Sequence, residues 1–193
     1  MPPTTPGGLM LYRAFDAAYP PATPPPGCQA VFGYIGGSRA LHVWPAAAWA
    51  PFKGLRQIPY WVPAITDNAT EAGQFAVRAA RELGWAPGPG TGPRVIGCDL
   101  ETIEDPAWYQ DFGNAVFSGG FQPFAYGSLS TVLQNAASDV VAAAWNGEAV
   151  IPPGQTIHGH QDQANIPYGG TQIDYSVIDD WLYERGGVGP RHA

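Results

Sequence analysis

Residues 94–105 read RVIGCDLETIED, an apolar run that ends in two carboxylates set two residues apart, Asp99 and Glu101. Side chains alternate along a β-strand, so both acids point to one face while Cys98 and Leu100 point to the other. In an α/β barrel, the C-terminal ends of the strands face the functional opening, where both acids would then lie. A strand end capped by solvated charges is the simpler interpretation of the same residues.

Seven further apolar runs predict strands, and the stretches between them indicate the fold class. The eight expected strands cover residues 10–16, 30–35, 58–64, 94–101, 121–126, 140–145, 156–161 and 172–177. Helices are expected at residues 69–83, 106–117, 45–52 and 130–137. After the sixth strand the gaps shorten and show no helical period. We therefore predict an α/β fold, a parallel TIM-like barrel that lacks helices in its last third.

The clearest helix begins near residue 69, after Asp67 or Asn68 as its cap, and ends at Gly84. Its expected apolar stripe consists of Ala69, Ala72, Phe75, Ala76, Ala79, Ala80 and Leu83. An open, doubly wound sheet is the rival fold. The absence of a G-x-G-x-x-G motif after the first strand weakens the nucleotide-binding form of that rival.

The length of 193 residues predicts one domain, with a core at about residues 9–184 and a C-terminal tail at 185–193. Apolar residues make up 45% of the chain and charged residues 13%, which excludes a mainly disordered protein. The two cysteines, Cys28 and Cys98, are too few for a disulfide framework, and we expect both to be free thiols.

The net charge of -7, with Lys53 as the single lysine, argues against nucleic acid or anionic lipid as a partner. The N-terminal sequence does not resemble a signal peptide, and no apolar run approaches the roughly 20 residues of a membrane span. A chain rich in Ala, Gly, Pro and Arg and poor in Lys is typical of an actinobacterial or phage gene.

Two more carboxylates lie on the expected first and last strands, which are neighbours when a barrel closes. Asp16 ends the first and Asp174 lies in the last. We therefore expect Asp16, Asp174, Asp99 and Glu101 to converge on one pocket. Crowded carboxylates raise one another's pKa, so one of them can stay protonated and donate to a leaving group. Cleavage of a glycosidic bond needs such a donor and an ionised partner.

Aromatic residues occur at matching places. Tyr19, Tyr34, Trp61, Tyr126 and Trp145 lie at or just beyond strand ends. Sugar rings bind to apolar aromatic faces, although aromatic residues at strand ends also serve core packing.

The ordered motifs YRAFDAAYP, VIGCDLE, FAYGS, VAAAW, HGHQD and QIDYSVID resemble the strand ends of glycoside hydrolase family 25, the lysozyme-type muramidases. They are still more similar to the glycoside hydrolase-like domains of unknown function of actinobacteria and their phages. The resemblance runs from about residue 11 to 179. It implies a flattened barrel with a helix-poor end and hydrolysis of the β-1,4 link between N-acetylmuramic acid and N-acetylglucosamine in peptidoglycan, without metal or cofactor.

The resemblance also implies roles for individual residues. Glu101 is the general acid, and Asp99 is the partner that positions or stabilises the reacting centre. The residues expected to hold substrate are Asp16, Asp174, Tyr34, Trp61, Tyr126, Trp145 and Gln161. Such an enzyme acts at the bacterial cell wall, which it would reach by phage lysis, virion delivery or nonstandard export.

Other interpretations remain open. Ser176 stands where a second acid is expected in the last strand, which favours a catalytically weak barrel that binds glycan or forms part of a phage particle or envelope assembly. His158, His160 and Asp162 share one face of a strand and have a spacing that suits a metal. Ser128 in YGSLS is a helix cap rather than a nucleophile, because the second glycine of a nucleophile elbow is missing.

Overall fold

The computed structural model describes residues 10–86, 94–101, 103–135, 139–143, 147–151 and 157–188. The strands are β1 (Tyr12–Asp16), β2 (Ala30–Gly36), β3 (Arg56–Trp61), β4 (Val95–Asp99), β5 (Gln122–Ser128), β6 (Val140–Ala143), β7 (Ile157–Tyr168), β8 (Thr171–Ile178) and β9 (Gly187–Val188). The helices are α1 (Ala46–Trp49), the 3-10 helix η1 (Ala50–Phe52), α2 (Ala69–Glu82), α3 (Pro106–Ser118), α4 (Leu129–Gln134) and α5 (Asp180–Arg185).

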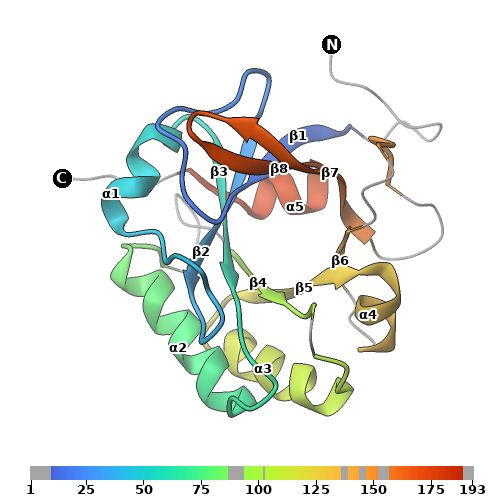
Figure 1. Cartoon of the computed structure of the whole chain (residues 1–193). Helices are drawn as coiled ribbons and strands as arrows, with labels where there is room; N and C mark the ends of the chain where they lie inside the picture. Colours follow the sequence, from blue (N-terminus) through green and yellow to red (C-terminus); the bar gives the residue numbers. More distant parts are fainter. Residues whose placement is uncertain are drawn as a thin grey trace.

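Strands β1 to β8 close into a barrel (Figure 1). They lie in the order β2, β1, β8, β7, β6, β5, β4, β3, and β2 also pairs with β3 to complete the ring. The predicted eight-stranded α/β barrel is therefore confirmed, with the first and last strands as neighbours. An open sheet is excluded because its two edges would stay unpaired.

Strand β8 runs antiparallel to both neighbours, β7 and β1, whereas the successive pairs from β1 to β7 are parallel. The expectation of a wholly parallel barrel is wrong for this strand. Tyr168 pairs with Thr171, and between them Gly169 and Gly170 have φ of 57° and 84°. A two-residue turn with positive φ at both positions reverses the chain, so the two strands form a hairpin and no helix lies between them.

After β8, helix α5 covers the end of the barrel at which β1 begins. Asp179 Oδ1 accepts a hydrogen bond from the Leu182 backbone N–H at 3.1 Å and caps α5. Leu182 is fully buried against the residues inside the barrel. Strand β9 pairs antiparallel with β3. Neither α5 nor β9 was expected from the sequence, and the predicted tail boundary at residue 185 is wrong because β9 belongs to the sheet.

Helices α2 and α3 pack against each other outside the barrel (Figure 1). Asn68 Oδ1 accepts from the Glu71 N–H at 3.0 Å and caps α2, while Asp105 caps α3. Both expected helices are confirmed. Phe75, which was assigned to the buried stripe of α2, is instead 44% exposed and packs under the Arg78 guanidinium, 5.1 Å from the ring centre. Within the described residues, no helix has the length and apolar character to cross a membrane.

The alternation of side chains along the strands produces two apolar layers. The outer layer lies between the strands and the helices and contains Trp44, Trp49, Trp85 and Phe112 among others. The inner layer fills the barrel and consists of Ala14, Ala30, Phe32, Ile58, Tyr60, Val95, Phe124, Tyr126, Val141, Ile178 and Leu182. A Cβ at Gly97 would lie 2.2 Å from the Tyr60 ring, so this glycine makes room for the inner aromatic residues. The polar site lies next to this inner layer, at the end of the barrel where β1 and β4 end.

Candidate active site

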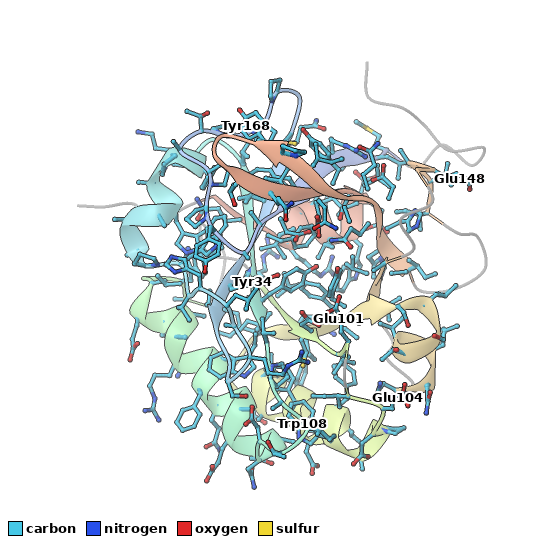
Figure 2. All side chains as sticks on the ribbon, in the orientation of Figure 1. Tyr34, Glu101, Glu104, Trp108, Glu148 and Tyr168 are labelled. Carbon is cyan, nitrogen blue, oxygen red and sulfur yellow. The ribbon has the colours of Figure 1, made fainter. Side chains whose placement is uncertain are left out.

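Four carboxylates gather where β1 and β4 end. Asp16 is the last residue of β1, Asp99 is the last residue of β4, and Glu101 follows two positions later. Asp174 comes from β8 and is the register partner of Asp16. The charges of the other three acids all act on Asp16, so the four share one site. Figure 2 shows Glu101 and Tyr34 within the ring of strands in this view.

Gln161 of β7 ties part of this cluster together. Its Nε2 donates to Asp16 Oδ2 at 3.0 Å and to Asp174 Oδ2 at 3.1 Å. The Tyr126 hydroxyl donates to Gln161 Oε1 at 2.8 Å. Gln161 is fully buried, at 0% exposure. Gln161, which was expected to hold substrate, therefore contacts two of the carboxylates from a buried position inside the barrel.

The Asp16 and Asp174 carboxyl groups favour protonation. Burial, followed by the charge of Asp174, raises the pKa of Asp16 well above its usual range, against the opposing hydrogen bond from Gln161. Burial also raises the pKa of Asp174, and hydrogen bonds from the Asn165 backbone N–H and from Gln161 oppose the rise. Two close carboxylates in a desolvated site hold a proton between them more readily than each alone.

Asp99 is half-buried, and Glu101 is exposed. Burial and the Glu101 charge raise the pKa of Asp99 to about 7, against the hydrogen bond from the Glu101 backbone N–H and the charge of Arg39. The Glu101 N–H donates to Asp99 Oδ1 at 3.1 Å. Asp99 therefore changes its charge near neutral pH, while Glu101 reaches into solvent at the opening.

Three tyrosines surround the acids. Tyr34 is half-buried, and Tyr126 and Tyr60 are buried. Burial raises the pKa of all three phenols, and the nearby carboxylates raise it further. The three phenols therefore stay neutral, and the Tyr126 hydroxyl donates a hydrogen bond to Gln161.

The sequence predicts Trp61 in the site, but Tyr60 is the aromatic residue of β3 that faces the inside of the barrel. Tyr60 packs inside the barrel, stacked on Phe32 with ring centres 4.9 Å apart. The next residue in the strand, Trp61, packs with the outer layer, where it lines a cavity of about 220 Å³ beside α2. Successive side chains of a strand point to opposite faces, so only one of these two neighbours can face the inside of the barrel. Trp145 lies outside the described residues.

His158, His160 and Asp162, the alternative metal ligands, each have a different partner. His158 lies between two carboxylates, with Nδ1 2.8 Å from Asp179 Oδ2 and Nε2 3.0 Å from Asp139 Oδ1. His160 Nδ1 lies 3.0 Å from the Glu148 carbonyl oxygen. Asp162 Oδ1 forms a 2.7 Å ion pair with Arg13. Across the described ranges, no three His, Cys, Asp or Glu side chains form a group that could hold a metal.

The predictions for Ser128 and for the two cysteines are confirmed. Ser128 Oγ accepts from the Thr131 N–H at 3.2 Å and caps α4, as expected. Cys28 and Cys98 are buried free thiols, as expected.

Two grooves lie outside the barrel mouth. One of about 830 Å³ runs between α2 and α3, and one of about 640 Å³ lies beside the Arg13–Asp162 ion pair. Neither is lined by the four acids. We locate the candidate site by its chemistry, because the shared electrostatics of the carboxylates is a more specific indicator of function than groove volume.

Comparison with known proteins gives matches in structure. No protein-family model matches the chain, and no curated protein matches its sequence. The crystal structure of an uncharacterized protein from B. stearothermophilus has a TM-score of 0.67 and 14% identity, over 91% of this chain and 99% of that one.

Two further matches are to proteins of named activity. The modular autolysin LytC of Streptococcus pneumoniae, also solved with a synthetic peptidoglycan ligand, matches with a TM-score of 0.64 and 13% identity, over 86% of this chain and 46% of LytC. A family 25 glycosyl hydrolase of Bacillus anthracis matches with a TM-score of 0.62 and 11% identity, over 91% and 93% of the two chains. This chain therefore has the barrel fold of glycoside hydrolase family 25, as its strand-end motifs indicated.

Proposed function

We propose that this protein is a glycoside hydrolase that cleaves the β-1,4 link between N-acetylmuramic acid and N-acetylglucosamine in peptidoglycan. The observation that carries the proposal is the gathering of Asp16, Asp99, Glu101 and Asp174 at one end of the barrel. Glycosidic cleavage requires one carboxylic acid and one carboxylate on either side of the bond. The LytC structure with its peptidoglycan ligand supports the choice of substrate class.

Glu101 acts as the general acid in this proposal. It is the exposed member of the cluster, so its side chain can reach a glycosidic oxygen in the opening. Asp99 lies deeper and acts in its ionised form, stabilising the positive charge that develops on the sugar. Asp16 and Asp174 lie beside them and tune the local charge. Tyr34, half-buried at the opening, offers an aromatic face to a sugar ring.

The test is release of reducing ends from purified actinobacterial peptidoglycan between pH 4 and 8. We expect the Glu101→Gln variant to lose at least about a hundredfold in rate, because it removes the proton donor. Glu104→Gln is the matched control, since Glu104 is also exposed and lies toward α3 in Figure 2. Equal rates for wild type and Glu101→Gln would remove Glu101 from the mechanism.

One observation favours a second candidate, a barrel that binds glycan without cleaving it. Two of the four acids are held by the buried Gln161, an arrangement that links β1, β7 and β8 and stabilises the barrel without chemistry. A structural component of a phage particle or envelope assembly could be built in this way. A wild-type protein that sediments with peptidoglycan but releases no reducing ends would establish this candidate.

In either case the proposed place of action is the bacterial cell wall, where peptidoglycan is found. The autolysin among the structural matches supports this location. The route to the wall, by phage lysis, virion delivery or nonstandard export, belongs to the same proposal.

A further inference from the structure

The amide nitrogen of Gln161 contacts two carboxyl groups. Nε2 donates to Asp16 Oδ2 at 3.0 Å and to Asp174 Oδ2 at 3.1 Å. The Tyr126 hydroxyl donates to Oε1 at 2.8 Å, so the oxygen end of the amide is also held. With both carboxyl groups ionised, reversal of the amide would place its oxygen against two negative charges.

We propose that Gln161 is a positioning residue, whose amide holds the Asp16 and Asp174 carboxyl groups together as one unit beside Asp99 and Glu101. Gln161 has no exposed surface, so it cannot reach a substrate itself. Its role in hydrolysis rests on the proposed function, but the contacts that define the unit do not.

Another glutamine shows that burial alone does not produce this arrangement. Gln57 of β3 is also fully buried, and its Nε2 donates to the Trp49 carbonyl oxygen at 3.2 Å. Its Oε1 has no hydrogen-bond partner among the residues that the structure describes. That contact joins a strand to the helix outside the barrel. At Gln161, by contrast, three hydrogen bonds connect side chains of β1, β5, β7 and β8.

The unit is surrounded by groups that disfavour two negative charges on it. The groups acting on Asp16 are Asp174 from β8, Asp99 and Glu101 from the end of β4, and the amide of Gln161 from β7. The neutral phenols of Tyr34, Tyr60 and Tyr126 are also within electrostatic range. The amide is the donor that lowers the pKa of both aspartates in this group. Without it, both carboxyl groups would be protonated up to a higher pH.

The test is a carbon-13 NMR titration of the aspartate carboxyl groups in the full chain, without substrate. Gln161→Met keeps the length of the side chain and removes its donors, so we expect the midpoints of Asp16 and Asp174 to move to higher pH. Gln57→Met is the control for loss of a buried glutamine, and it should leave both midpoints unchanged. Unchanged midpoints in a folded Gln161→Met protein would overturn the proposal.

Tyr126→Phe provides a second test if Gln161→Met does not fold. It removes only the hydroxyl that holds the oxygen end of the amide, so the same two midpoints should rise by a smaller amount. A folded Tyr126→Phe protein with wild-type midpoints would then overturn the proposal.

Kinetics give a readout of the catalytic consequence. Gln161→Met should lower kcat by about tenfold or more and leave KM nearly unchanged, because the residue acts through the acids and touches no substrate. A raised KM with wild-type kcat would assign Gln161 to substrate binding and contradict positioning. If wild type shows no hydrolysis, the proposed function fails, while the titration still decides the role of Gln161.

Discussion

Asp99 accepts a hydrogen bond from the backbone N–H of Glu101, the residue two positions later, at 3.1 Å. One carboxyl group thus has two tasks, since it carries charge in the site and shapes the turn that presents the proposed acid. These tasks can be separated by substitution, because an asparagine oxygen can accept the same hydrogen bond without carrying a charge.

Asp99→Asn and Asp99→Ala should differ in stability but agree in activity. Both remove the charge, so hydrolysis should fall by about a hundredfold or more in each. Only Asp99→Ala also removes the acceptor of the turn, which should make it less stable than Asp99→Asn by about 1 kcal/mol. Urea unfolding and a reducing-end assay measure the two effects. Full activity in Asp99→Asn would show that the charge is not required.

The pH profile of hydrolysis should report Asp99. Its pKa is raised to about 7, and the proposed mechanism needs its ionised form. Ionisation of Asp99 should therefore contribute a limb of kcat/KM that rises through about pH 7, and this limb should be absent in Asp99→Asn. A wild-type rate that falls as the pH increases through 7 would instead make Asp99 the proton donor and reverse the two roles.

Asp16→Asn should stabilise the protein at neutral pH. The folded-state pKa of Asp16 is raised above its unfolded value of about 3.9, so its contribution to stability is lost as the pH rises. Asparagine has no charge to bury, and we expect a gain of about 1 kcal/mol at pH 7.5, or about 2–4 °C in Tm. At pH 4 the gain should shrink.

Asp111→Asn is the control for this substitution, since Asp111 is exposed on α3 and should give no pH-dependent gain. An Asp16→Asn protein that is less stable than wild type at pH 7.5 would show that the ionised carboxylate stabilises the barrel.

His158 should stabilise the protein at low and neutral pH. Burial lowers its pKa, but the hydrogen bonds and charges of Asp139 and Asp179 outweigh that effect and raise it to about 9. Because the folded pKa exceeds the unfolded value of about 6.5, the stabilisation is fully present below pH 6.5 and is lost as the pH rises through about 9. His158→Gln should cost about 1–3 kcal/mol at pH 6 and less at pH 9.5.

Thermal unfolding of both proteins across this pH range measures the difference, in which the effects of acids that do not contact His158 cancel. His42→Gln is the control, because His42 stacks on the exposed Tyr19 outside this network. A stability difference between wild type and His158→Gln that does not change with pH would contradict a charged His158.

The positions of Asp16 and Asp99 could be predicted because each follows from the residues next to it in the sequence. Asp16 and Asp99 end apolar runs, and strand ends meet at one rim of a barrel. The direction of β8 was also readable, since Gly169 and Gly170 between two apolar runs are a hairpin signal that the sequence analysis did not use.

Other features depend on contacts that no local pattern contains. Tyr60 and Trp61 are both aromatic, and only the register of β3 decides which one faces the inside. The role of Gln161 required partners 145 and 35 residues away, in Asp16 and Tyr126. Helix α5 has 6 residues and is held by its Asp179 cap and the burial of Leu182, so its apolar period is too short to detect.

The β7–β8 hairpin has a consequence for the order of folding. Its strands are joined by two residues, and hairpins of this kind form in about 1–10 μs, long before distant segments meet. Gln161 and Asp174 lie on this hairpin, whereas Asp16 arrives with β1 from the opposite end of the chain. Half of the acid unit can therefore assemble early, and docking of β1 both closes the ring and completes the polar cluster. Closure of the ring by β1 and completion of the polar cluster are then the same event.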